Sequence, residues 1–307
     1  MLAPARWRVF HASRSEPSFW ESVGLRRSSA TNRIRIRAPV GLTDILVSEQ
    51  GHSMTRSANE VHSLFDRFRF STPRSDELEL LDEPGHDSSE LAQNFRDIRR
   101  VNALLGGTSI VLRHLPPLVD SVPGSDPVTI LDLATGSADI PVAIARWARK
   151  RGRRVSIVAS DYSDEILALA RDQVEGHPEI SLANYDARAL PLPDDCFDIV
   201  VCSLSLHHFD PHDAVRVLQE MDRVARSGFV LNDLRRGRLG YLAAWIAARL
   251  TTRNRLTRND APLSVKRAYT PGELDDLLHR AGVSDATISK HLWFRMAAVK
   301  SSAPDAS

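Results

Sequence analysis

The chain has 307 residues, of which 26% are charged, and a formal net charge of +1. This length is enough for one α/β domain with appended segments, and a core of that size needs no disulfide or metal for stability. A near-neutral balance gives no global electrostatic reason to expect nucleic acid or an acidic membrane as partner. The two cysteines, Cys196 and Cys202, cannot form a disulfide framework, and no cysteine–histidine cluster has metal-ligand spacing. We therefore expect no metal and a reducing, cytoplasmic location.

The first 75 residues differ in composition from the rest of the chain. They are rich in arginine and serine, and the first fifty contain no lysine. This composition is typical of an organelle transit peptide. It is equally typical of a disordered arm, or of upstream sequence from a wrongly assigned start, with Met54 as the alternative initiator. We treat residues 1–75 as an extension outside the domain.

The segment 76–125 is predicted to be helical. Between residues 88 and 107 apolar side chains recur at three- and four-residue spacing, which predicts a helix capped by Ser88 or Ser89. A second, shorter helix follows and is predicted to stop at Pro116. Two interpretations stay open for this segment: a helical lid over a pocket, or a cover for one edge of the sheet.

From residue 126 onward, short apolar runs alternate with helical segments. This alternation predicts a parallel sheet with helices on both faces. The core is expected to span 126–303, with an additional lid or insert helix at 236–268. The predicted strands are VTILDLA (128–134), VSIVASD (155–161), ISLANYD (180–186), FDIVVCSLSL (197–206), GFVLNDL (228–234) and the closing strands in ATISKHLWFRMAAVK (286–300).

The first strand runs into a turn of small residues, ILDLATGSADI (130–140). Small side chains let a ligand approach the backbone N–H groups that open the next helix. Only Gly136 of a dinucleotide-binding G-x-G-x-x-G pattern is present, so a tight turn without a ligand is an equal alternative. Asp161 and Asp186 close the next two strands; each alone would be a helix cap or a solvated turn residue. Because carboxyl ends of parallel strands meet at one edge of a sheet, together they predict a ligand site there.

Four segments carry a family resemblance: ILDLATGSADIP, VASDYSDEILALAR, YDARALPLPDDCFDIVVCSLSLHHF and FVLNDLRRGRLGYLAAW. Together they resemble the class I S-adenosylmethionine-dependent methyltransferases, and within these the methyltransferase-11/UbiE-like branch of bacterial small-molecule enzymes. The resemblance runs from about Ser88 to Lys300. It implies a Rossmann-like, doubly wound α/β sheet of seven mostly parallel strands with an antiparallel last strand, plus the N-terminal helical lid.

The resemblance also implies a cofactor, S-adenosyl-L-methionine, and a set of residues that bind it. Asp132 would hold the amino end of the methionine part. The other implied residues are Ala134, Thr135 and Gly136 at the methionine part, Asp161 at the ribose, Tyr162 on the adenine ring, Asp186 and Ala187 at the adenine edge, and Ser203 with Leu204 beneath the sulfonium. The chain departs from the family at the glycine-rich loop, since Ala134 and Ala138 stand at glycine positions and each adds a methyl group.

His207 and His208, at the end of the fourth strand, are the candidate general bases for removing a proton from an acceptor hydroxyl. Their alternative role is structural, as a packed imidazole and a cap for the next helix. The apolar helix at 239–250, with Tyr241 and Trp245, suits a hydrophobic aromatic acceptor. It suits equally well a packing role on the lid helices, or a homodimer contact.

The expected function is methyl transfer to a small hydrophobic acceptor, phenolic, quinol or polyketide-like, first on oxygen and second on carbon. One alternative is a non-catalytic S-adenosylmethionine-binding or interaction protein of the same fold. A nicotinamide-dependent dehydrogenase is disfavoured by the missing glycines and by the lack of a Tyr-x-x-x-Lys pair. Nucleic acid is disfavoured as a partner because no basic face is evident. Integral membrane association is not expected, because the apolar run at 239–250 is too short to span a bilayer and contains Arg249.

Overall fold

The computed structural model describes residues 73–83, 85–124 and 126–301, all within the compact unit 56–307. The expectations for the N-terminal extension, including Met54 as a start, lie outside the described residues, except for positions 73–75. Within the described ranges, no helix combines the length and the apolar character that crossing a bilayer requires.

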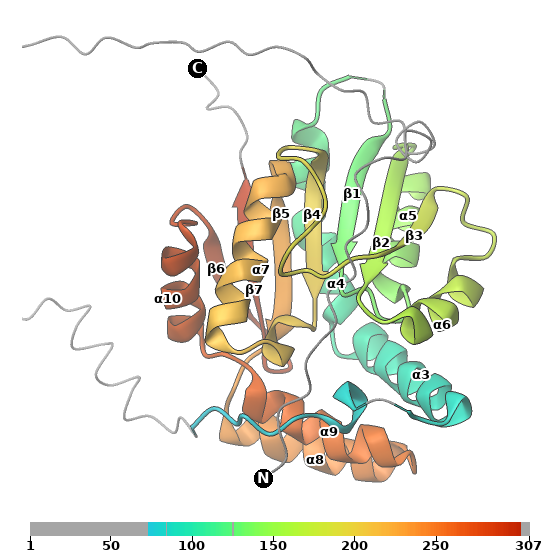
Figure 1. Cartoon of the computed structure of the whole chain (residues 1–307), viewed down its shortest axis with the longest axis vertical. Coiled ribbons are helices and arrows are strands. Elements are labelled where there is room, and N and C mark those ends of the chain that lie inside the picture. Colours follow the sequence, from blue (N-terminus) through green and yellow to red (C-terminus); the bar gives the residue numbers. More distant parts are fainter. Residues whose placement is uncertain (1–72, 84, 125, 302–307) are drawn as a thin grey trace, which may run out of the picture. The chain divides into compact units, whose positions relative to one another are not determined.

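A seven-stranded sheet forms the centre of the domain, in the order β3-β2-β1-β4-β5-β7-β6 (Figure 1). The five strands from β3 to β5 pair in parallel, while β7 runs antiparallel to both of its neighbours. The predicted sheet, with its antiparallel last strand, is confirmed. The strands are β1 (Val128–Leu133), β2 (Val155–Asp161), β3 (Ile180–Asn184), β4 (Phe197–Ser203), β5 (Ala225–Leu234), β6 (Thr287–His291) and β7 (Arg295–Ser301).

The strand order reverses between β1 and β4, and this reversal positions the site. In open α/β sheets, ligands bind in the crevice beside the carboxyl ends of the strands at such a reversal. The loops that follow β1, β2 and β4 all leave from this edge.

Helices cover both faces of the sheet. α4 (Gly107–Ser121) and α5 (Asp139–Lys150) pack together with α6 (Asp164–Val174), whereas α7 (Pro211–Val224) packs with α10 (Pro271–Ala281). Side-chain hydrogen bonds fix the starts of three helices. The Ser163 hydroxyl accepts from Ile166, Asp210 accepts from the first turn of α7, and Thr270 and Glu273 form a reciprocal capping box.

Several predicted boundaries are wrong; the fourth strand, for example, ends at Ser203 and not at residue 206. The cap of α3 (Ser88–Leu104) is Asp87, whose carboxylate accepts from two backbone N–H groups. α4 does not stop at Pro116 but continues to Ser121, because its apolar face is completely buried and that packing outweighs the lost ladder bonds. β3 ends at Asn184, so Asp186 lies in the following loop.

The segments before and after the core gather over the carboxyl edge of the sheet. α9 (Arg255–Arg267) contacts α3, α8 (Arg238–Thr251) and the short 3-10 helices η1 (Leu80–Asp82) and η2 (Leu206–His208). In Figure 1 α3, α8 and α9 lie together at the bottom of the view. The insert predicted as one helix is therefore two, and α3 covers the site edge whereas α4 packs on a face of the sheet. That these segments act as a lid stays a prediction.

Candidate functional site

The loop between β1 and α5 has an unusual backbone. Ala134, Gly136 and Ala138 all have positive φ angles, of 50°, 56° and 57°. Glycine adopts this left-handed conformation freely, while an alanine pays about 1–2 kcal/mol for it. The two alanines that replace family glycines thus keep the glycine-like conformation of the loop and carry its strain.

Two carboxylates lie beside this loop. Asp161 accepts hydrogen bonds from the backbone N–H groups of Gly136 (3.0 Å) and Ser163 (3.1 Å). Burial raises the pKa of Asp161 above its usual range, and it raises the pKa of Asp132 to about 8, where the neighbouring carboxylates of Asp139 and Asp161 add to the effect. Closely spaced buried acids of this kind favour a positively charged ligand or a shared proton.

The residues predicted at the adenine end lie further along the edge. Tyr162 follows β2 and is about half exposed, and Ala187 is buried. The carboxylate of Asp186 is held by Arg188 at 2.8 Å, and Arg188 also pairs with Asp213 at 2.8 Å. Burial would raise the pKa of Asp186, but the hydrogen bonds from Arg188 outweigh it and hold this pKa below its usual range. The role of Asp186 at the adenine edge stays a prediction.

The ends of β4 and β5 are joined by Asn232, which is completely buried. The side-chain amide of Asn232 donates to the hydroxyl of Ser203 (2.8 Å). Its backbone carbonyl accepts from the backbone N–H of Leu204 (2.7 Å). These bonds fix the turn that leads into η2 and its two histidines.

His207 and His208 are both oriented by carboxylates. The imidazole Nδ1 of His207 lies 2.7 Å from Asp233 Oδ1, and the backbone N–H of His207 donates to the same carboxylate. The Nδ1 of His208 lies 2.9 Å from Asp82 Oδ1. Burial would lower the pKa of His208, but the charges of Glu79 and Asp82 outweigh it and raise this pKa to about 9. His208 therefore holds a proton at neutral pH.

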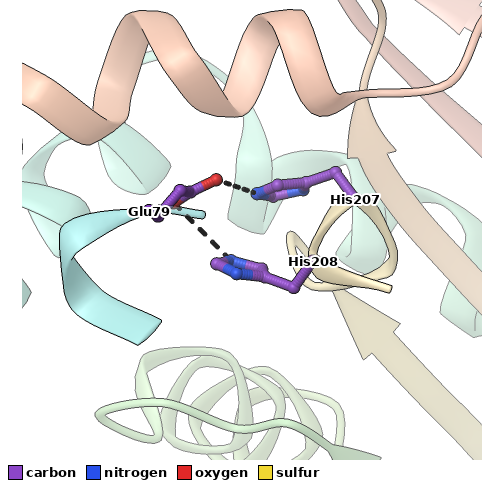
Figure 2. A group of neighbouring side chains, drawn as sticks. All are labelled: Glu79, His207 and His208. Atoms are coloured by element: carbon purple, nitrogen blue, oxygen red, sulfur yellow. Dashed lines mark ion pairs between the residues drawn. The ribbon is translucent and has the colours of Figure 1, made fainter. Parts of the chain in front are cut away.

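Glu79 is a site residue that the sequence did not reveal. Its side chain is buried and faces both histidines, with Oε1 3.7 Å from His207 Nε2 and Oε2 3.8 Å from His208 Nε2 (Figure 2). It is far from both histidines in the sequence. The sole signal was the acidic character of the segment DELELLDE (76–83), which resembles an ordinary solvated stretch.

Residues 73–83, which we name the strap, carry Glu79 into place. The carboxylate of Asp260 accepts from the N–H groups of Leu80 (2.8 Å) and Leu81 (3.0 Å). The buried guanidinium of Arg267 donates to the carbonyl oxygens of Glu77 and His208 and pairs with Asp82 at 3.2 Å. Two residues of α9 thus fasten the strap over the histidines.

A side chain of α3 covers the loop after β1. The ring of Phe95, from α3, packs against Gly136, so that a Cβ added there would meet Phe95 at 3.1 Å. A cavity of about 120 Å³ lies beside Phe95, between α3 and α6. A larger cavity of about 510 Å³ is lined by residues 188–192 and 216–223 and contains none of the predicted binding residues.

Comparison with known sequences identifies the middle of the chain. Residues 130–228 match the family described as methyltransferase domain. A demethylmenaquinone methyltransferase of Lysinibacillus sphaericus is 34% identical over 98 residues, which are 32% of this chain and 40% of that protein. The ubiquinone/menaquinone biosynthesis C-methyltransferase UbiE of Geobacter sulfurreducens is 36% identical over 102 residues, 32% of this chain and 38% of its own. The chain thus matches about two fifths of the length of these relatives.

Comparison with solved structures supports the same fold. The carbon methyltransferase CurJ aligns with a TM-score of 0.53 at 11% identity, over 71% of this chain and 62% of its own. Human N-acetylserotonin methyltransferase, solved in complex with S-adenosylmethionine, aligns with a TM-score of 0.50 at 16% identity. The alignment covers 70% of this chain and 56% of that protein. Likeness at such low identity is a likeness of fold, which agrees with the sheet order and with the match over residues 130–228. By its sequence, the segment 130–228 is a methyltransferase domain, and the sheet around it has the fold of the two solved methyltransferases.

Proposed function

We propose that the protein transfers a methyl group from S-adenosylmethionine to a small hydrophobic acceptor with a phenolic or quinol ring. The observation that carries the proposal is the loop after β1, whose backbone N–H at Gly136 is fixed by Asp161 while Asp132 stays buried beside it. The hydroxyls of Thr135 and Ser137, in the same loop, are buried without a hydrogen-bond partner. Unpaired buried hydroxyls next to two carboxylates suit a polar ligand with a positive end.

The donor would be held by the residues at this edge. Asp132 and the loop would hold the amino-acid part, Asp161 the ribose hydroxyls and Tyr162 the adenine face. Asp186, Ala187 and Ser203 complete the proposed set. Bound S-adenosylmethionine supplies an electrophilic methyl group, so the protein has to align the acceptor, exclude water and remove a proton.

His207 is the proposed general base. Asp233 holds its Nδ1, so its Nε2 is the atom that would take the hydroxyl proton of the acceptor. The resulting oxyanion makes both the oxygen and the ring carbons beside it more nucleophilic. The sequence alone favoured oxygen as the methylated atom. The relative named a C-methyltransferase favours carbon, and we propose carbon methylation first.

Calorimetric titration of the full chain with S-adenosylmethionine, S-adenosylhomocysteine and NAD tests the donor site. We expect micromolar binding of the two adenosyl ligands, none of NAD, and loss of binding in Asp161→Ala. Incubation with a methyl-labelled donor and reduced naphthoquinones, followed by mass spectrometry and NMR, then shows whether carbon or oxygen carries the label. Donor binding without any transfer to aromatic acceptors would favour the non-catalytic alternative.

A further inference from the structure

The side chains of Glu79, His207 and His208 leave a gap between them that ordinary hydrogen bonding does not explain. Their facing atoms are 3.7 and 3.8 Å apart, whereas a direct charge-assisted hydrogen bond would bring them to about 2.7–2.9 Å. Glu79 Oε1 is buried and has no hydrogen-bond partner. Three potential ligand atoms, one from each residue, lie within 4.8 Å of one another (Figure 2).

The orientation of the two imidazoles matches that of metal ligands. A histidine that binds a metal through one nitrogen almost always donates its other N–H to a carboxylate, a carbonyl or water. Here Asp233 and Asp82 lie at the Nδ1 atoms of His207 and His208, so both Nε2 atoms face Glu79. Two independent carboxylate–histidine pairs thus converge on one point.

The local charge also favours a cation. Glu79, Asp82 and Asp233 carry three negative charges around the histidines, and Arg267 supplies one positive charge, 3.9 Å from Glu79 Oε1 and 3.2 Å from Asp82. Arg74 supplies a second positive charge, since it donates to the backbone carbonyl of His207 at 3.0 Å, and the three carboxylates still outnumber the two guanidinium groups. A divalent ion would add the positive charge that this largely buried cluster lacks.

We propose that Glu79, His207 and His208 form a binding site for a divalent transition metal ion, with zinc as the best match. Two imidazole nitrogens and one carboxylate oxygen are a donor set that zinc uses in sites with one open position. If the proposed function holds, the ion would occupy His207 Nε2, so that the cation at its open position, in place of that imidazole, would ease the loss of the acceptor proton. The metal site itself does not depend on methyl transfer.

Calorimetric titration of the full chain with zinc chloride, after removal of metals with EDTA, tests the site. We expect one zinc ion to bind with micromolar or tighter affinity, and at least a tenfold weaker affinity in Glu79→Gln and in His208→Ala. The matched control is His212→Ala, which alters the exposed cluster Asp210–His212–Asp213 and should leave zinc affinity unchanged. Circular dichroism establishes that each variant is folded. If only one of Glu79→Gln and His208→Ala folds, that variant alone is enough to test the site.

Absence of zinc binding to the wild-type protein would overturn the proposal, as would equal affinity in the folded Glu79→Gln or His208→Ala variant. Binding that only His212→Ala weakens would assign the zinc to the exposed cluster instead. Because the readout is binding, a failure of the metal site is distinguishable from a failure of methyl transfer.

A separate observation concerns the outer surface of α8. Leu239, Leu242, Ile246 and Leu250 follow a spacing of three, four and four residues and therefore form one stripe along the helix. All four are exposed, Leu239 by 72% and Leu250 by 81%. An apolar stripe on a helix is normally turned toward a core, so among the described residues this stripe has no partner of the kind that its pattern predicts.

The turn between β6 and β7 extends the apolar surface. Leu292 and Trp293 are both exposed, and Trp293 has a positive φ of 59°. Phe294, the next residue, packs against Gly240 near the start of α8, where an added Cβ would meet it at 3.0 Å. The stripe and the exposed turn are thus adjacent.

The sequence segment that contains α8 carries charge of one sign, although Glu90 of α3 pairs with Arg255 at 3.3 Å. Residues 235–259 contain seven arginines and no acidic residue. Arg238, Arg249, Arg253 and Arg255 are exposed, and Arg249 stacks on Trp245 with its guanidinium carbon 4.1 Å from the ring centroid. A basic helix with an apolar stripe is the pattern of helices that lie in the interface of anionic membranes.

We infer that α8 and the β6–β7 turn dock this protein on the surface of an anionic bilayer. The described helices include none that could cross a bilayer, so the contact would be peripheral. A second copy of the chain is a poorer partner. A two-fold contact through α8 would place the arginines of one copy against those of the other.

Flotation of the full chain with vesicles of phosphatidylcholine, with or without phosphatidylglycerol, tests this surface. We expect binding only to the anionic vesicles, a decrease with salt, and at least a tenfold decrease in Leu242→Asp/Ile246→Asp. Arg249→Glu should weaken binding. The matched control is Arg151→Glu, which should leave vesicle binding unchanged. Arg151 also stacks on a tryptophan at the end of a helix, with its guanidinium carbon 5.1 Å from the ring centroid of Trp147.

No binding to anionic vesicles at low salt would overturn the inference, as would unchanged binding by Leu242→Asp/Ile246→Asp. Light scattering measures the oligomeric state and so tests the alternative that a second copy of the chain covers this surface. A dimer that becomes monomeric in Leu242→Asp/Ile246→Asp would assign the surface to a second copy of the chain.

Discussion

The two halves of the candidate site are built in different ways. On the donor side, Asp132, the loop to Ala138 and Asp161 come from the ends of two neighbouring strands. On the acceptor side, the histidines after β4 meet a strap from before the first long helix and two side chains of α9. A regular sheet places the first half, whereas specific long-range polar contacts place the second. The donor side should therefore respond to changes in backbone conformation, and the acceptor side to the loss of single polar side chains.

The largest effect is expected at Arg267. Arg267→Ala removes a buried guanidinium that binds Asp82 and two backbone carbonyl groups, and it leaves those groups unpaired. We expect a loss of about 3–5 kcal/mol in the free energy of unfolding, together with faster proteolysis within the strap. Arg255→Ala is the control, because this exposed residue of the same helix pairs with Glu90 at 3.3 Å and should contribute less than about 1 kcal/mol. Equal effects would show that the strap is not fastened through Arg267.

The buried acid Asp132, on the donor side, should make the free energy of unfolding depend on pH. The pKa of Asp132 is about 8 in the folded protein and about 3.8 when unfolded, so between these values only the native state keeps the proton. The free energy of unfolding should therefore fall as pH rises from 5 to 8, by up to about 1.4 kcal/mol per pH unit. In Asp132→Asn, the free energy of unfolding should change less with pH over the same range. Urea unfolding of both proteins checks this, and parallel curves would contradict it.

Gly136, in the loop after β1, contacts the ring of Phe95 in α3. Gly136→Ala places a methyl group 3.1 Å from Phe95 in a backbone with φ of +56°, so both strain and displacement of α3 should follow. We expect a loss of about 1–3 kcal/mol and weaker binding of S-adenosylhomocysteine. Gly152→Ala is the matched control, since its φ is +65° but nothing lies within 4 Å of the added carbon. If the two variants lose the same stability, Phe95 does not restrain the loop.

The smallest expected effect is a gain. Ala134→Gly relieves a left-handed alanine and should raise the free energy of unfolding by about 0.5–1 kcal/mol after the entropy of glycine is counted. Ala138→Gly should gain less, because its methyl group is completely buried and is lost in the exchange. Thermal unfolding of both variants measures the difference, and a loss of stability in Ala134→Gly would mean that the loop is not strained there.

Some site features follow from local pattern, and others do not. The small residues after the first strand and the aspartate after the second predicted a ligand edge, because parallel strands bring their carboxyl ends together. Asp186 shows the limit of this reasoning, since β3 ends two residues earlier and Arg188 holds the carboxylate. The +1 net charge gave no reason to expect an anionic surface as partner, but an average over the chain hides the arginines that surround α8.

The sequence by itself determined the alternation of strands and helices, the mostly parallel sheet and the resemblance of the middle of the chain to methyltransferase domains. These features depend on neighbours within a few residues, or on a fold whose connections are regular. The tertiary structure alone decided that α4 continues through its prolines, that the apolar stripe of α8 faces outward and that Glu79 meets His207 and His208. Each of these results from contacts between residues far apart in the chain, and periodicity and spacing carry no information about such contacts.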